Sequence, residues 1–217
     1  NNLGAPKRFD NKINSKFHES TPVFTKDGKT MYFTRNNFLN GKRGKDSKSV
    51  TLLKMYKSTL VDGQWANIAE LPFNSDNYSV AHPALSLDEK TLYFASDMPG
   101  TLGQSDLFKV TINENGTYST PENLGAKINT EGRETFPTIS AENELYFASD
   151  GRPGLGGLDI YVTRLDENQN IGEIQNIGAP ANSQKDDFAF IIDSETRKGF
   201  FTSNRDGGKG FDDIYKF

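Results

Sequence analysis

The stretch at residues 144–165, "ELYFASDGRPGLGGLDIYVTRL", joins an aromatic strand pattern, a Ser-Asp pair, a glycine-rich loop and a second strand that begins Asp-Ile-Tyr. Related copies begin at Thr91, "TLYFASDMPGTLGQSDLFKVTI", and at Gly199, "GFFTSNRDGGKGFDDIYKF". A motif that recurs along one chain indicates structural repeats. The repetition therefore bears on the fold before any single residue is assigned a function.

The spacing of the aromatic residues identifies the type of repeat. Phe33, Phe94, Phe147 and Phe201 each follow another aromatic residue, and they are separated by 61, 53 and 54 residues. A period near 53 with strand composition is typical of propeller blades, which commonly have four antiparallel strands. Apolar residues nowhere keep a helical spacing through a dozen positions. The sequence predicts an all-β fold, a four-bladed β-propeller of four-stranded antiparallel blades.

The ends of the chain suggest how the ring closes. The last repeat stops after its third strand, and the chain begins with Leu3-Gly4-Ala5, which matches Leu124-Gly125-Ala126 in an outer strand. We expect the N-terminal strand to complete the last blade, because closure removes a free sheet edge. The chain is then one domain, residues 1–217, with blades at about 18–75, 80–130, 134–183 and 187–217 plus 1–8. The alternative is a fragment of a larger ring whose earlier blades are missing.

Composition excludes several classes of function. The chain has 25 basic and 29 acidic residues and a formal charge of −4, so no global basic field attracts nucleic acid. It has no cysteine and two histidines, which excludes disulfides and makes a zinc site improbable. No run approaches the roughly 20 apolar residues of a membrane span. We expect no nucleic-acid partner, no direct membrane span and no cofactor.

The acidic and amide residues of the repeated loops have a structural interpretation. Short polar side chains that end a strand accept backbone N–H groups in the following turn, and a second Asp begins the returning strand. Near-identical copies around a ring favour a scaffold over catalysis. The residues of this repeat motif are Asp97, Asp106, Asp150, Asp159, Asn204 and Asp213.

The long segment from "LYFASDGRPGLGGLDIYVTRL" to the end of the chain resembles a known repeat class. It is similar to the PD40 or WD40-like (TolB-like) propeller repeats of OmpA-family, peptidoglycan-associated cell-envelope proteins, and the resemblance covers nearly the whole chain. It implies a periplasmic, outer-membrane-associated module, often part of a lipoprotein, that serves secretion or assembly machinery. Its partner would be an outer-membrane or periplasmic protein complex, and peptidoglycan would bind through a domain absent from this chain. Blade one departs from the pattern, with Arg35-Asn36 instead of Ser-Asp and a longer basic loop.

The linkers between blades carry a second repeat, an Asn followed by Ser or Thr. In three of four linkers an acid follows five residues later, and these acids, Glu19, Glu134 and Asp187, are expected to ring the channel mouth. Such a ring suggests a calcium site, because converging carboxylates repel one another and calcium prefers oxygen ligands. The alternative, which we favour, is that the acids are solvated or pair with local bases, so we expect no metal.

The loop of blade one is the better candidate for a binding surface. Lys42, Arg43 and Lys45 follow Phe38, and Arg152 and Arg205 occupy the equivalent loops of blades three and four. Such a set offers charged groups around a few apolar anchors to an anionic or protein partner. The alternative is a solvated, mobile loop.

These observations lead to two hypotheses. The first is a non-catalytic interaction or scaffold module, because the sequence has no G-x-S-x-G elbow and no P-loop. The expectation is therefore that the chain is not an enzyme. The alternative is a propeller that binds or cleaves carbohydrate through the acidic channel mouth, since paired carboxylates hydrolyse glycosides.

Overall fold

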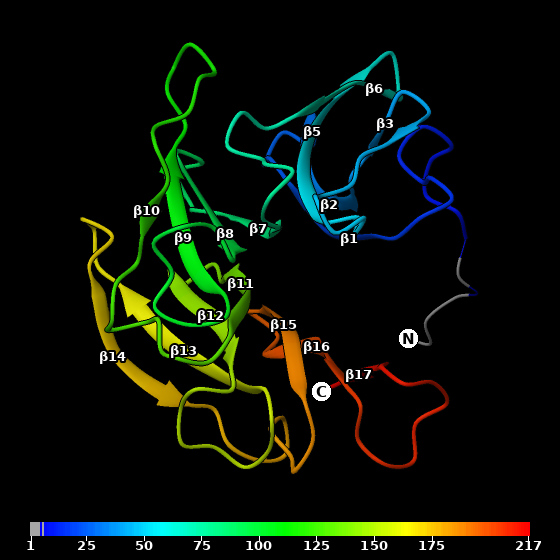
Figure 1. Ribbon diagram of the computed structural model, residues 1–217. Coiled ribbons are helices and arrows are strands. Elements are labelled where there is room, and N and C mark those ends of the chain that lie inside the picture. Colours follow the sequence, from blue (N-terminus) through cyan, green and yellow to red (C-terminus); the bar gives the residue numbers. More distant parts are fainter. Residues whose placement is uncertain (1–4, 6) are drawn as a thin grey trace.

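The computed structural model describes residue 5 and residues 7–217, and it is all-β. Four small antiparallel sheets are arranged around a common centre (Figure 1). The first sheet consists of β1 (Glu19–Phe24), β2 (Thr30–Asn36), β5 (Leu53–Val61) and β6 (Gln64–Glu70). The second consists of β7 (Val80–Leu85), β8 (Thr91–Ser96), β9 (Asp106–Thr111) and β10 (Glu122–Asn123). The third consists of β11 (Glu134–Ile139), β12 (Glu144–Ser149), β13 (Asp159–Leu165) and β14 (Ile171–Asn176). The prediction of a four-bladed β-propeller is confirmed.

The fourth sheet has three strands among the described residues: β15 (Asp187–Asp193), β16 (Lys198–Ser203) and β17 (Asp213–Lys216). Most of the N-terminal strand expected to complete this sheet, residues 1–4 and 6, lies outside the described residues. Residues 7 and 8 are not in a strand. Closure of the ring by the N-terminal segment therefore stays a prediction. In the part of the chain that the structure describes, no helix could span a membrane.

The second strand of each blade shows why the blades stack. In β8, Leu92 and Phe94 pack with residues of blade one, whereas Tyr93 and Ala95 pack with residues of blade three. Successive side chains of a strand point to opposite faces, so a blade between two neighbours needs apolar residues on both faces. This requirement explains the continuous apolar run in "LYFA", where a strand with one solvated face would alternate with polar residues.

The buried residues form three clusters between successive blades. One joins blades one and two, a second joins blades two and three, and a third joins blades three and four. A fourth cluster lies on the other face of blade one, where Ile13 of the N-terminal segment packs on Met31, Phe33 and Tyr56. The core is therefore divided among the blade interfaces.

Each innermost strand contains a bulge at the same position of the repeat. Thr21, His82, Phe136 and Ala189 have positive φ angles of 46°, 59°, 49° and 52°, and the pairing register shifts beside each of them. A bulge bends a strand and increases its twist. Four equivalent bulges bend the four strands alike where they line the axis, a feature that the sequence analysis did not predict.

Candidate functional site

The glycine-rich loops lie against the linker that leads to the next blade. The amide of Gln104 donates to Gly132 O at 2.9 Å, and the amide of Asp187 donates to Leu158 O at 2.6 Å. A Cβ atom on Gly103 would lie 2.5 Å from the backbone of Glu131, and one on Gly156 would lie 2.3 Å from Lys185 O. These two positions need glycine because the loop touches the backbone of the linker.

In blades two to four, the Asp that begins the third strand accepts hydrogen bonds from the backbone of its own loop. Asp159 Oδ2 accepts the amides of Leu155 and Gly156 at 2.6 and 3.2 Å, and Asp213 Oδ2 accepts those of Lys209 and Gly210 at 2.7 and 2.9 Å. Asp106 Oδ2 accepts the amide of Leu102 at 2.8 Å. These carboxylates accept backbone donors that face the inside of the loop, so their contacts are structural.

In blades two to four, the residue that follows the Ser at the end of the second strand accepts a hydrogen bond from the backbone of the linker. Asp97 accepts the amide of Ser79 at 2.6 Å, Asp150 accepts that of Arg133 at 2.6 Å, and Asn204 accepts that of Asp186 at 2.8 Å. The variant Asn of blade four therefore makes the same contact as the Asp of blades two and three. Because an amide oxygen accepts as a carboxylate does, the contact survives the change.

The side chain of the repeated linker Asn forms hydrogen bonds with the backbone of the third strand, as a neighbouring strand would. Asn182 accepts the amide of Ile160 at 2.8 Å and donates to Ile160 O at 2.9 Å. Asn129 makes the same pair of bonds with Leu107, and Asn74 makes it with Met55. The sequence revealed this repeat, but its role depends on the third strand, which lies 19 to 22 residues away.

The three linker acids do not form an open ring at the channel mouth, and that expectation was wrong. Glu134 and Asp187 are fully buried. Glu134 accepts the amide and hydroxyl of Thr130, both at 2.7 Å, and Asp187 accepts those of Ser183 at 2.6 and 2.8 Å. Glu19 accepts the amide of Ser15 at 2.9 Å. The physical reason is that each acid caps a turn made by the Ser or Thr four residues before it, as in capping motifs.

Two of the loop arginines predicted to bind a partner instead join the blades internally. Arg152 Nη2 donates to Lys127 O and, at 2.9 Å, to Ile128 O. Arg205 Nη1 donates to Pro180 O at 3.0 Å, and its Nη2 donates to Asp187 at 2.6 Å. The guanidinium of Arg205 also lies over the rings of Phe201 and Tyr215, 4.7 and 5.0 Å from their centroids. Their donors are directed into the blade, which corrects their assignment to a binding surface.

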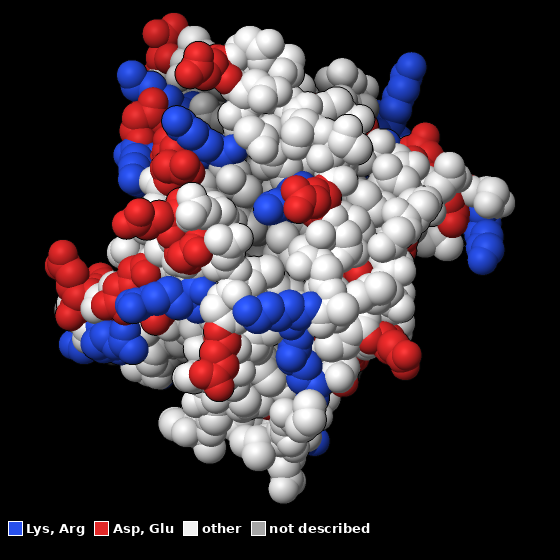
Figure 2. All heavy atoms as spheres, turned by 90° about the vertical axis from the view of Figure 1, so that its left-hand side faces the viewer, with Lys and Arg blue, Asp and Glu red and all other residues white. Residues whose placement is uncertain are grey.

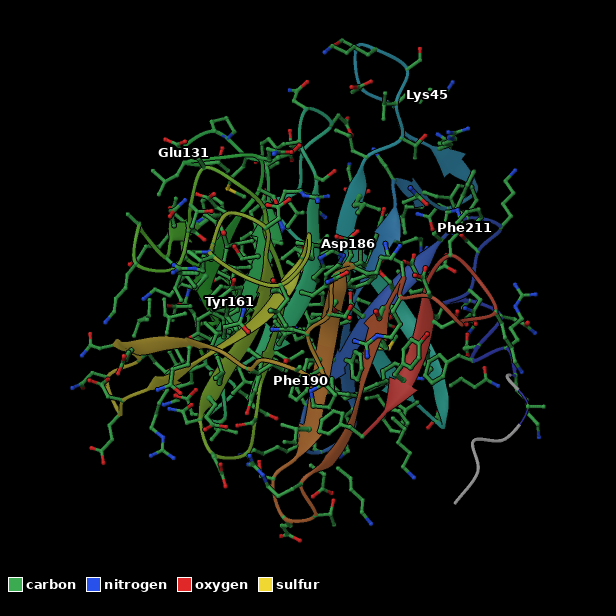
Figure 3. The ribbon with its side chains drawn as sticks, turned by 90° about the horizontal axis from the view of Figure 1, so that it is seen from below. Lys45, Glu131, Tyr161, Asp186, Phe190 and Phe211 are labelled. Carbon is green, nitrogen blue, oxygen red and sulfur yellow. The ribbon has the colours of Figure 1, made fainter. Side chains whose placement is uncertain are left out.

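The basic loop of blade one is different, because it forms an additional hairpin. Strands β3 (Phe38–Leu39) and β4 (Lys42–Arg43) pair in antiparallel fashion. Asn37 anchors the hairpin: it is buried, its backbone bonds to Leu52 and Gly44, and its Nδ2 donates to Asp76 at 2.7 Å. Figure 3 shows Lys45 on the loop that follows β4, and this loop projects beyond the neighbouring loops.

Aromatic rings and cations gather at the base of this hairpin. Phe17 and Phe38 meet edge to face at 5.1 Å, with Lys16 Nζ 5.5 Å and Arg43 Cζ 5.2 Å from the Phe17 ring. Lys42, Arg43, Lys45 and Lys48 are exposed. We call the following residues the hairpin patch: Lys16, Phe17, Phe38, Lys42, Arg43, Lys45 and Lys48. Of the predicted binding residues, Phe38, Lys42, Arg43 and Lys45 lie in it, whereas Lys16 and Phe17 were not predicted because they precede β1.

The outer surface of the ring has a different character. The face formed around β10 and β14 carries acidic and basic side chains beside one another (Figure 2). Mixed charge of this kind gives no extended field of one sign. Compared with this face, the hairpin patch has an excess of cations and two aromatic rings.

His82 is the titratable residue at the axis. Its Nδ1 lies 2.7 Å from Thr135 Oγ1, and its ring stacks on Phe136 with centroids 3.8 Å apart. Burial lowers the pKa of His82 to about 3, so the imidazole is neutral at physiological pH. Among the described residues there is no group of three or more His, Cys, Asp or Glu side chains that could hold a metal ion.

Comparison with known proteins shows the fold. No family model and no curated protein matches the chain. Among solved structures, the Hadza microbial sialidase Hz136 is similar with a TM-score of 0.55 and 14% identity over 92% of this chain and 44% of that chain. A puromycin-hydrolysing peptidase of Mycobacterium tuberculosis is similar with a TM-score of 0.52 and 16% identity over 92% of this chain and 29% of that chain. The chain thus spans less than half the length of either enzyme.

A third similar solved structure has a lower TM-score. A putative TolB from Agrobacterium tumefaciens is similar with a TM-score of 0.47 and 17% identity over 90% of this chain and 73% of that chain. At these identities the likenesses show the fold alone.

These neighbours correct one expectation. From the sequence we expected that the chain is not an enzyme, yet the solved structures that share its fold include a sialidase and a peptidase. Because one fold hosts many functions, the propeller gives no ground for excluding catalysis. What the comparisons establish is the β-propeller fold, which this chain shares with these two enzymes.

Proposed function

We propose that the chain is a binding module that holds an anionic protein partner through the hairpin patch. The observation that carries this proposal is the cluster of Lys16, Phe17, Phe38 and Arg43 at the base of a hairpin that the other three described blades do not have. Aromatic residues and Arg are enriched in protein interfaces, and surrounding charges raise the rate of association and select the partner. The patch thus combines apolar anchors with long-range attraction.

The partner we propose is a protein complex of the bacterial periplasm or outer membrane. This choice rests on the resemblance to repeats of OmpA-family, peptidoglycan-associated proteins. In such a protein the propeller would contribute the protein contact, and peptidoglycan would be bound by a separate domain. The negative charge of the whole chain, −4, makes the basic hairpin the favoured side for an acidic partner.

The test is affinity capture from an envelope extract, with the retained proteins identified by mass spectrometry. Wild type is compared with the triple variant Lys42→Ala, Arg43→Ala, Lys45→Ala at the same salt concentration. A matched control removes three exposed cations elsewhere: Lys90→Ala, Arg164→Ala, Lys198→Ala. We expect wild type and control to retain the same acidic complex and the triple hairpin variant to lose it. Equal capture by all three would remove the hairpin patch from the proposal.

A second candidate is a propeller that binds or cleaves carbohydrate. Its support is the shared fold with a sialidase at a TM-score of 0.55. The acids that the sequence suggested for this activity cap turns, and two of them, Glu134 and Asp187, are fully buried, so the candidate needs another site. Incubation of the chain with a panel of glycans, followed by chromatography of the products, tests it. Retention or cleavage of a glycan by both the wild type and the triple hairpin variant would favour this candidate over the first.

A further inference from the structure

An apolar pocket of about 220 Å³ lies on the axis of the ring. All four innermost strands, β1, β7, β11 and β15, contribute to its wall, and Figure 1 shows these strands around the centre of the molecule. The lining residues lie at the bulges of these strands or one to three positions after them. Each innermost strand begins at a linker and ends at the turn into the second strand. The pocket therefore lies toward these turns, away from the linkers and the glycine-rich loops.

Aromatic rings close the inner end of the pocket. Phe136 lines the pocket, and its ring lies between those of His82 and Phe188, with centroids 3.8 and 4.7 Å away. His82 in turn lines a separate pocket of about 290 Å³ among the linkers and loops. The stack of three rings therefore separates the two pockets, and a molecule enters the apolar pocket from the end of the axis nearest the turns.

The pocket offers few partners to water, because none of its lining residues is charged. The hydroxyl of Thr138 donates to Phe190 O at 2.6 Å. The hydroxyl of Thr21 shares a hydrogen bond of 3.1 Å with that of Thr34. Three of the lining residues are prolines, which have no N–H to donate: Pro22, Pro83 and Pro137. A neutral apolar molecule displaces such poorly held water favourably.

The volume of the pocket and its closed end select the kind of ligand. An apolar cavity of roughly 150 Å³ holds benzene, so a pocket of about 220 Å³ has room for two fused rings. Because His82 and Phe188 cover both faces of the Phe136 ring, this ring presents an edge to the pocket. The electropositive edge of one aromatic ring is attracted to the face of another. An aromatic ligand therefore gains a contact that an aliphatic ligand of equal size does not.

We propose that this pocket binds a neutral aromatic group of one or two fused rings, up to the size of indole. The ring enters past Ile191, which is 52% exposed at the mouth, packs against the three prolines and meets the edge of Phe136. The chemistry fits two sources, a free aromatic molecule or an aromatic side chain of a peptide. The inference goes beyond the hairpin patch, which extends from the segment between β2 and β5 at the opposite end of the axis.

The test detects binding by the shifts of methyl NMR signals and by isothermal titration calorimetry. Toluene and indole are the neutral ring probes, N-acetyltryptophanamide presents the ring on a peptide unit, cyclohexanol is the aliphatic probe and benzoate the charged one. A bound ring shifts nearby methyl signals through its ring current, so the methyl groups of Leu85, Ile139 and Ile191 report on the pocket. Val61 and Leu155, which are exposed and do not line the pocket, are internal controls.

Substitutions at the mouth test the site without disturbing the core. Ile191→Trp places a large side chain at the mouth, and Ile191→Asp places a charge there. Val61→Trp and Val61→Asp are the matched controls at an exposed strand position outside the pocket. The triple hairpin variant Lys42→Ala, Arg43→Ala, Lys45→Ala separates a failure of this proposal from a failure of the hairpin patch. Thermal unfolding of each variant checks that it is folded.

We expect indole to bind wild type, both Val61 variants and the triple hairpin variant alike, with a dissociation constant below about 1 mM, and to shift the methyl signals of the pocket alone. Ile191→Trp should weaken this binding by about tenfold or more, because the new side chain occupies the mouth, and Ile191→Asp should weaken it severalfold. Benzoate should bind about tenfold more weakly than indole, since its charge would be buried without a partner. Cyclohexanol should bind severalfold more weakly, since it lacks the ring contact.

The same measurements identify the source of the ring. Binding of N-acetyltryptophanamide as tightly as indole would identify a peptide side chain, whereas binding of toluene and indole without it would identify a free aromatic molecule. The proposal is overturned if neither toluene nor indole shifts the methyl signals of the pocket, if cyclohexanol or benzoate binds as tightly as indole, or if both Ile191 variants bind as wild type does.

Discussion

At the scale of single residues, the linker Asn side chains stand in for strand backbone. Asn182 is 2% exposed, and its amide satisfies both the N–H and the C=O of Ile160. The same pairing at Asn129 and Asn74 means that three linkers attach to their blades in this way. A side chain that satisfies two buried backbone groups contributes more to stability than an ordinary surface hydrogen bond.

We predict that Asn182→Ala lowers the free energy of unfolding by about 2–3 kcal/mol, because the backbone groups of Ile160 lose their partners in a buried place. Urea unfolding followed by fluorescence measures the change. Asn168→Ala, at an exposed position in the β13–β14 turn, is the control and should change stability by less than about 0.5 kcal/mol. Equal effects of the two substitutions would contradict a structural role for the linker Asn.

His82 makes stability depend on pH. Its pKa is lowered to about 3 in the folded chain, because packing against neighbours such as Phe136 desolvates the half-buried His82, and its ordinary value is 6.5. Below pH 6.5 the unfolded chain takes up a proton that the folded chain does not, so stability is lost as the pH falls from 6.5 toward 3.

We predict that wild type loses about 2 kcal/mol more stability than His82→Gln between pH 7 and pH 5, since the unfolded state alone becomes protonated over about 1.5 pH units. Chemical unfolding at the two pH values measures the difference. Between pH 7 and pH 8 the stabilities of the two proteins should change in parallel, which serves as the control. A loss that is the same in both proteins down to pH 5 would show that His82 can become protonated in the folded chain.

At the scale of elements, the innermost strands carry a repeated backbone strain. Ala189 in β15 has a φ angle of 52°, a conformation that costs a residue with a Cβ roughly 1–2 kcal/mol and that glycine adopts freely. The equivalent bulges in the other blades are at Thr21, His82 and Phe136. Side-chain contacts at the axis, such as the stack of His82 on Phe136, help to offset this cost.

We predict that Ala189→Gly raises the free energy of unfolding by about 0.5–1 kcal/mol, because glycine relieves the left-handed conformation. Ala148→Gly in β12 is the matched control: Ala148 is buried in an ordinary strand, so this substitution should destabilise by about 1 kcal/mol. Thermal and urea unfolding of both variants measure the two changes. A loss of stability in Ala189→Gly would contradict the strain argument.

At the scale of the whole molecule, each of the three interfaces between successive blades contains a buried cluster of its own. Strand β17 is the edge strand of a three-stranded sheet among the described residues. Phe217 exchanges two backbone bonds with Gly199, so in antiparallel alternation the amides of Ile214 and Lys216 point away from β16. These two amides report directly on whether a further strand pairs with β17.

From the repeat Leu3-Gly4-Ala5 we predict that residues 1–8 pair with β17. Deleting residues 1–6 should then speed hydrogen exchange at the amides of Ile214 and Lys216 by at least tenfold, because paired amides exchange only when the strand opens. Amide exchange in β9, which is paired on both sides, is the internal control and should change little. Unchanged exchange at Ile214 and Lys216 would show that these residues do not complete the blade.

The sequence by itself determined the repeat, the all-β class and the four blades, because the spacing of strand pairs such as Tyr93-Phe94 and Tyr146-Phe147 is a local property of the chain. It also located the long basic loop of blade one, which the structure shows as a hairpin, because the extra length of this loop is apparent when the repeats are aligned. These features depend on the order and period of residue types.

Only the tertiary structure decided what the charged residues do. Because Glu134 and Arg205 are charged, the sequence predicts that they are exposed. In the structure the linkers and loops fold over them, and both form contacts inside the blade. Arg35 breaks the Ser-Asp pattern, yet only the fold shows that its side chain is buried, with the guanidinium over the rings of Phe33 and Tyr56. Sequence period reports which residue types recur, whereas burial and hydrogen bonding depend on segments that are distant in the chain and adjacent in the ring.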